Sequence, residues 1–244
     1  MRVNALVTVT ALLTLAGCQA GPSTDTKAPF PRPQTPLKAV GQEPGWMLNM
    51  TNDALSLSYQ YGEKQFQANN PQLEHTTKGY RYTAVSSEGE KLILYISDQY
   101  CTDSMSGMPY PYTATVIVGT QTLEGCGGDP QSLLTGKQWV VVKITGQDVI
   151  DSSRITVEFS GGGRVHGTTD CNQYVGNYEI TGGGIDIREL SQTRMACAPA
   201  LMKQEEQVLG MMADARSFSL NETGDLVLSG GPNSRLRLSA KEHQ

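Results

Sequence analysis

The chain has 244 residues, of which 18% are charged and 7% aromatic, and its formal net charge is -5. Lysine and arginine are scattered with no basic block, which argues against a nucleic-acid partner. The 26 glycines and the short runs rich in Thr, Ser, Val and Tyr favour many short strands joined by turns.

The first predicted element is a lipoprotein signal sequence. Met1-Arg2 precedes an apolar run from Ala5 to Leu15, and two small residues then lead to Cys18. This pattern predicts removal of residues 1–17 and lipidation of Cys18. The alternatives are a buried N-terminal helix and a transmembrane helix, but the latter needs ~20 apolar residues, about twice the length of this run. Gln19 stands where aspartate would indicate retention in the inner membrane. We therefore expect an outer-membrane anchor facing the periplasm.

Residues 18–40 form the next predicted segment. Five prolines fall between Pro22 and Pro36, and the segment has no apolar periodicity. It is therefore expected to be a disordered or polyproline-like tether. The residues that follow Cys18 could hold a folded domain up to ~70 Å from the membrane at ~3.1 Å per residue.

Residues 41–128 are predicted to form a first, β-rich domain. Apolar and polar residues alternate at 55–61, 80–84 and 92–96, which is typical of strands with one buried face. An irregular segment at 98–112 precedes a further strand at 113–119, and no stretch has helical periodicity. About six strands in this span predict a small bent antiparallel sheet or barrel.

A composition break at 125–130 sets off a second predicted domain, residues 131–244. Its apolar runs and glycine turns predict strands at 139–144, 154–159, 164–168, 174–180, 185–187, 216–220, 225–229 and 235–239. One helix is expected after Pro199, with Leu201, Met202, Val208, Leu209 and Met212 on its apolar face, opposite Lys203, Gln204, Glu206 and Gln207. The predicted fold class is therefore mainly β (α+β), with two small antiparallel bent-sheet or barrel-like domains.

The cysteines indicate two disulfides. Lipidation of Cys18 leaves Cys101, Cys126, Cys171 and Cys197, an even set expected in an oxidising compartment. Of the three connectivities we favour Cys101–Cys126 and Cys171–Cys197, since each pair lies inside one predicted domain. A metal site or redox pair is the alternative, but the sequence has no Cys-x-x-Cys.

The second half resembles the META domain, the family typified by the HslJ heat-shock proteins. The resemblance is carried by Trp139, the hairpin at 159–167, Cys171-Asn172, Tyr174, Tyr178, Thr193-Arg194-Met195-Ala196-Cys197, Met202, Glu205 and Leu226-Val227-Leu228. It covers residues 133–240 and implies a cracked antiparallel barrel wrapped around one helix. The first half resembles an uncharacterised envelope-lipoprotein domain through Glu43-Pro44-Gly45-Trp46, the segment 101–106, Tyr110-Pro111 and Gly125-Cys126.

No catalytic set or cofactor site is predicted. His75, His166 and His243 are far apart in sequence and belong to no triad motif, so a surface or structural role is favoured for them. No metal site is predicted either. Asp98, Asp103 and Asp129 are too loosely spaced for calcium. The methionines at 105, 108, 195, 202, 211 and 212 could ligate copper, but such residues more often fill cores.

Asn172 and Arg194 are candidate ligand or structural residues, because both flank cysteines expected to be bonded together. The structural interpretation gives Asn172 the hydrogen bonds of a turn and Arg194 an ion pair.

We expect a non-enzymatic outer-membrane lipoprotein that binds a partner or supports the envelope under stress. The alternative is a lipid or small apolar ligand carrier, or a secretion-pilot-like chaperone, that uses the barrel cavity of the second domain. The two differ in whether Leu201, Val208 and Met212 fill that barrel or leave it open. The expected partners are the membrane, through the lipid on Cys18, and an envelope protein or a small apolar ligand.

Overall fold

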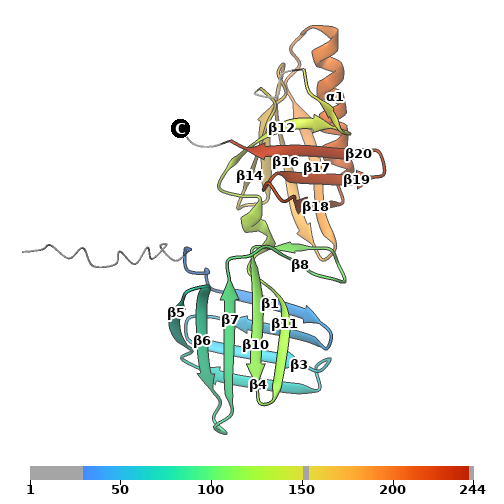
Figure 1. Ribbon diagram of the computed structural model, residues 1–244. Helices are drawn as coiled ribbons and strands as arrows, with labels where there is room; N and C mark the ends of the chain where they lie inside the picture. Colours follow the sequence, from blue (N-terminus) through green and yellow to red (C-terminus); the bar gives the residue numbers. More distant parts are fainter. Residues whose placement is uncertain (1–29, 151–153, 242–244) are drawn as a thin grey trace, which may run out of the picture.

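The computed structural model describes residues 30–150 and 154–241. Two antiparallel sheets each curl around an apolar core of their own, and one α-helix, α1 (Pro199–Asp214), packs against the second sheet (Figure 1). The predicted mainly β class is confirmed. The predicted signal sequence, Cys18 and the tether as far as Pro29 lie outside the described residues. Within the described ranges, no helix has the length and apolarity needed to cross a membrane.

The first sheet has nine strands in the order β4-β3-β2-β1-β11-β10-β7-β6-β5. Their bounds are β1 Leu37–Gln42, β2 Gly45–Met50, β3 Ala54–Tyr59, β4 Lys64–Asn69, β5 Gln72–Thr76, β6 Gly79–Val85, β7 Lys91–Ser97, β10 Tyr112–Val118 and β11 Gln121–Gly127. Alternate side chains on these strands point into one core, as in Leu92, Leu94 and Ile96 of β7. A bridge between Ala68 and Ser86 brings the β4 end of the sheet against the end of β6, which curls the sheet into a barrel.

Strand β1 begins at Leu37, inside the segment predicted to be tether. Leu37 and Ala39 are buried in the first core, and β1 pairs with both β2 and β11. The chain is already fixed at Phe30, whose ring packs edge-on against Tyr80 and whose carbonyl accepts a hydrogen bond from the Tyr80 hydroxyl. The proline-rich sequence around it gave no sign of a strand. The pairing of β1 with β11 involves residues almost ninety positions away, which a local pattern does not show.

The second sheet has the order β17-β16-β15-β14-β12-β20-β19-β18, with the short β13 paired to β12. Its strands are β12 Gln138–Ile144, β13 Gln147–Asp148, β14 Thr156–Ser160, β15 Arg164–Thr168, β16 Gln173–Thr181, β17 Gly184–Gln192, β18 Ser217–Leu220, β19 Leu226–Gly231 and β20 Ser234–Ala240. The central residue is Trp139, which is fully buried and donates its indole N–H to the carbonyl of Leu134 at 2.9 Å.

Helix α1 lies against β17, β19 and β20. Val208 and Met212 are fully buried in the second core, and Leu201 is partly buried. The predicted faces are wrong at two positions: Met202 is largely exposed, whereas Gln204 is buried with Glu205 beside it. The inward face of α1 is therefore partly polar. Gln204 and Glu205 can be buried because residues on the neighbouring turns form hydrogen bonds with them.

A small hairpin joins the two halves. Strands β8 (Cys101–Thr102) and β9 (Pro109–Tyr110) pair within the irregular segment, and β9 contacts both β18 and a 3-10 turn, η1 (Pro130–Leu133). Met108, at the base of β9, is only 4% exposed and belongs to the core of the second sheet. The first half of the chain thus contributes Met108 to the core of the second, and the partly buried Tyr110 packs against that core.

Candidate functional site

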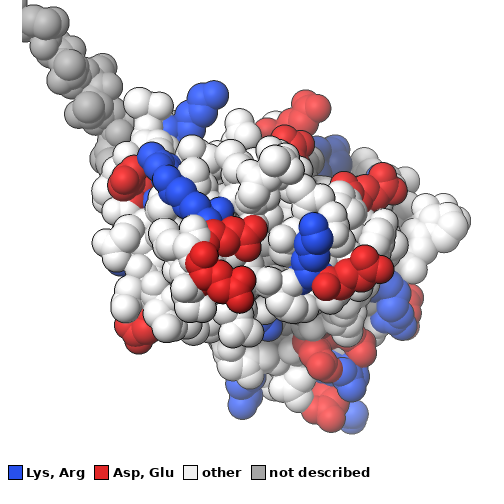
Figure 2. All heavy atoms as spheres, turned by 90° about the horizontal axis from the view of Figure 1, so that it is seen from below, with Lys and Arg blue, Asp and Glu red and all other residues white. Residues whose placement is uncertain are grey.

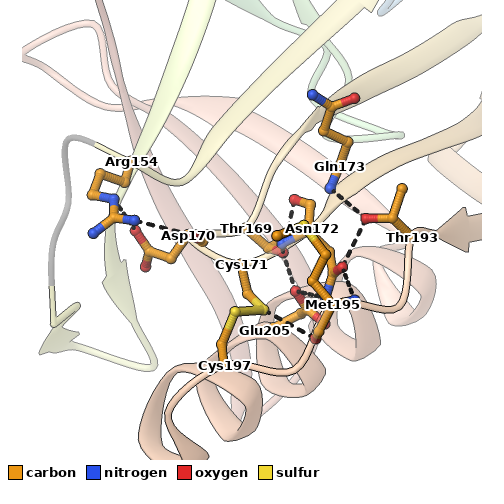
Figure 3. The surroundings of a disulfide bond; sticks show 10 residues. All are labelled: Arg154, Thr169, Asp170, Cys171, Asn172, Gln173, Thr193, Met195, Cys197 and Glu205. Carbon is orange, nitrogen blue, oxygen red and sulfur yellow. Dashed lines mark hydrogen bonds and ion pairs between the residues drawn. A yellow bond between two sulfur atoms is a disulfide. The ribbon is translucent and has the colours of Figure 1, made fainter.

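Both predicted disulfides are present. Cys101 is bonded to Cys126 and Cys171 to Cys197, so the favoured connectivity is confirmed. The second bond ties the turn after β15 to the segment that enters α1, as Figure 3 shows. Pro199 begins the helix two residues after Cys197, so the disulfide fixes the start of α1 against the sheet.

Asn172 joins the same segments by hydrogen bonds. Its amide nitrogen donates to Glu205 Oε1 and Oε2 at 3.0 and 3.1 Å. Its amide oxygen accepts from the Thr193 hydroxyl at 2.7 Å and from the Met195 backbone N–H at 2.8 Å. Both lone pairs of the oxygen are therefore used within the protein. Asn172 is buried and positions the strap 193–198 over the helix (Figure 3).

Glu205 is the charged residue at the centre of this cluster. It is only 5% exposed, and besides Asn172 it accepts a hydrogen bond from the Thr169 hydroxyl. Burying a carboxylate without hydrogen-bond donors costs several kcal/mol of folding free energy. Each hydrogen bond to a charged group returns on the order of 1.5–3 kcal/mol. The resemblance motifs Cys171-Asn172, Thr193–Cys197 and Glu205 thus belong to one hydrogen-bonded unit.

A second polar contact lies beside it. Gln204 accepts from the Ile150 backbone N–H at 2.8 Å and donates to Asp170 Oδ2 at 3.2 Å. Asp170 also forms an ion pair with Arg154 at 3.4 Å. These contacts hold the helix entrance to the turn that carries Cys171.

Arg194 has a different environment from Asn172. Its side chain is exposed on the strap, next to the exposed Met195, and it forms no ion pair with any residue in the described ranges. The strap therefore presents Arg194 to solvent while Asn172 holds the strap in place.

The other candidates fall in separate places. His166 lies in β15 opposite Glu158 and Val175, and His75 lies in β5 of the first sheet. Met105 is 79% exposed, whereas Met108 is buried in the second core. Across residues 30–150 and 154–241, no three side chains of the types His, Cys, Asp and Glu gather as metal ligands would.

A large hollow lies on the first barrel. Its volume is about 1470 Å³, and its walls come from the β1–β2 turn, the β5–β6 turn, the segment after β7, and strands β10 and β11. Sequence reasoning missed it, because these segments meet only through the curl of the sheet. Several residues that carried the resemblance of the first half line it, namely Glu43, Cys101, Thr102, Asp103, Ser104, Gly125 and Cys126.

The indole ring of Trp46 packs against Gly41 and Gly125, two glycines that line the hollow. The Trp46 indole donates to the Glu124 carbonyl at 3.1 Å and crosses directly over two glycines. A Cβ at Gly41 would lie 2.1 Å from Trp46 Nε1, and one at Gly125 would lie 2.8 Å from Trp46 Cζ2. Only glycine fits under the ring at these two positions.

Asp103 fixes one wall. Burial pushes the pKa of Asp103 upward, but hydrogen bonds from Ser106 and Gln42 outweigh that effect and leave the pKa below its usual value. The Ser106 backbone N–H donates to Oδ2 at 2.8 Å, and Gln42 Nε2 donates to Oδ1 at 3.1 Å. A charged carboxylate therefore links the cystine loop to the β1–β2 turn.

The second half is a curled antiparallel sheet with one helix packed against it and a disulfide at the start of that helix. Residues 132–243 match the family model of the META domain, so this part of the chain is similar to META domains.

Solved structures give weaker likenesses. An NMR structure of a protein from Burkholderia xenovorans is 23% identical with a TM-score of 0.38, over 46% of this chain and 87% of that one. A second NMR structure is 21% identical with a TM-score of 0.38, over 45% and 92%. A crystal structure of a duf4847 family protein from Bacteroides vulgatus is 11% identical with a TM-score of 0.36, over 48% and 99%. No curated protein matches significantly.

Proposed function

We propose that this protein is a lipid-anchored envelope protein of the outer membrane that faces the periplasm and acts by binding. The observation that carries the proposal is that all four cysteines other than Cys18 are paired in disulfides. Disulfides persist in oxidising compartments such as the periplasm. The fifth cysteine, Cys18 of the predicted lipoprotein signal, has no part in these bonds and is available for lipidation.

The tether is shorter than the sequence indicated. Because Phe30 is packed against the first barrel, only residues 19–29 remain between the predicted lipid and the folded part. Eleven residues at ~3.1–3.5 Å each span at most about 40 Å. The first barrel would therefore stay close to the membrane.

The buried polar residues at the entrance of α1 are already used in holding the second barrel together. Asn172, Thr169 and Glu205 satisfy one another, so this cluster supports a structural role over catalysis. The alternative of an apolar carrier in the second barrel is disfavoured, because Val208 and Met212 are fully buried within it. These side chains occupy the space that a ligand would need.

The anchor is tested by Cys18→Ser with membrane fractionation and intact-mass analysis. We expect the wild-type chain in the outer-membrane fraction with a lipid mass on its first residue, and the variant unprocessed or released. A wild-type chain without lipid, or a variant that still sediments with the outer membrane, would overturn the proposal. Cys171→Ser serves as a control, because it also removes one cysteine but leaves the lipidation site intact.

A further inference from the structure

We propose that the hollow on the first barrel binds organic polycations, that is, ligands with two or more ammonium groups. This inference deepens the binding role proposed above but does not depend on the lipid anchor. Its first support is charge. The charged residues of the lining are Glu43, Asp98, Asp103, Glu124 and Lys78, with His75 beside them. Four carboxylates against one lysine give the hollow a formal charge of -3 with His75 neutral.

The concave shape strengthens this field. Carboxylates spread around a depression of about 1470 Å³ act together on a charge inside it, because the low-dielectric protein walls focus the potential. By contrast, acidic and basic side chains are interspersed on the face of the molecule shown in Figure 2. The uneven charge is therefore a property of the hollow and is not repeated on that face.

The uncharged lining suits ammonium groups as well. An ammonium has three donors and no acceptor, so it needs oxygen acceptors around it. Hydroxyl groups line the hollow at Thr76, Thr77, Ser97, Thr102, Ser104, Thr113 and Thr115. Phe30 adds an aromatic ring to the lining.

The site is prebuilt. Asp103 is held charged by Ser106 and Gln42, the Cys101–Cys126 disulfide fixes the adjoining loop, and Trp46 braces β1 against β11. Glu43, Asp98 and Glu124 are exposed and accessible to a ligand. The hollow is larger than a molecule with a single ammonium group. An extended ligand with several ammonium groups therefore fits it better.

The test is calorimetric titration of the full chain in detergent with two probes, spermidine and trilysine. Both carry ammonium groups, so the comparison separates a free polyamine from a basic peptide as the source. Binding should weaken strongly between about 10 mM and about 500 mM salt. Hydrogen exchange with the tighter probe should slow at 97–104, 113–115 and 124–126.

Three variants make the test specific. Glu43→Gln and Glu124→Gln should each weaken binding about twofold to fivefold, and Lys78→Gln should strengthen it by a similar factor. Glu63→Gln removes an exposed carboxylate at the β3–β4 turn, outside the hollow, and should change nothing. The proposal is overturned if neither probe binds at low salt, if Glu63→Gln weakens binding as much as Glu124→Gln, or if Lys78→Gln fails to strengthen it.

Discussion

The side-chain amide of Asn172 spans both carboxylate oxygens of Glu205, so one turn of the sheet is fastened to the middle of the helix. The two residues are 33 positions apart and both are buried. Their pairing explains why a charged side chain can face the core of a barrel. It also makes the cluster sensitive to the loss of any one member.

Asn172→Ala should destabilise the protein by about 2–4 kcal/mol, because the buried Glu205 side chain would lose the Asn172 donor. Chemical denaturation of the full chain measures this change. Glu205→Ala should likewise be costly, whereas Glu206→Ala, one residue along and exposed, should cost less than about 0.5 kcal/mol. Equal effects of the two glutamate variants would contradict the role given to Glu205.

Cys171→Ser and Cys197→Ser should each cost about 2–5 kcal/mol, and the double variant should cost no more than either. All three lose the same bond, which fixes the entry of α1. Unfolding curves under non-reducing conditions give the three values. A double variant much less stable than both singles would mean that the cysteines contribute separately.

Met108→Ala should destabilise the second barrel by about 2–3 kcal/mol, although Met108 belongs to the hairpin of the first half. Met105→Ala is the matched control, since Met105 is exposed and should change stability little. Hydrogen exchange should quicken in η1 and β18 for Met108→Ala alone. Unchanged exchange there would show that Met108 adds nothing to that core.

The two halves should fold separately, but with different limits from those expected from the sequence. A fragment starting at Gly41 would lose the first four residues of β1, including Ala39 and Val40, which pair with β11, so we expect 30–128 to fold and 41–128 to fail. The fragment 131–244 should fold but unfold at lower denaturant than in the full chain, because it lacks Met108. Dispersed amide spectra and melting curves would check both points. A folded 41–128 would show that β1 is dispensable.

The stabilisation from Asp103 should depend on pH. Its folded pKa is depressed, so its contribution is present above the unfolded value near 3.8 and is lost as pH falls through the folded pKa. The stability gap between wild type and Asp103→Asn should therefore be wide at neutral pH and narrow below pH ~3.8. Denaturant titrations at several pH values test this, with the exposed Asp53→Asn as control. A gap that stays constant with pH would refute it.

Local patterns predicted much of this architecture. The alternation in β3, β6 and β7, the helix start at Pro199 and the cysteine pairing depend on residues near one another in sequence or on simple counting, and the structure agrees with them. The misses share a different cause. Strand β1 is stabilised by its pairing with β11, which is distant in sequence. Gln204 and Glu205 turn inward because distant turns supply donors, and the hollow joins six separated stretches of chain. Such features depend on tertiary contacts that no local pattern encodes.

The position of Met108 also bears on the order of events during synthesis. The ribosome makes the chain from its N-terminus, so the hairpin that carries Met108 exists before any strand of the second sheet. That sheet can then close around a side chain that is already in place, and its last strand, β20, completes the layer beside β12. A circular permutation that moved residues 98–112 behind β20 would reverse this order of synthesis. The second sheet would then be made first, and its core would contain a gap until Met108 was added.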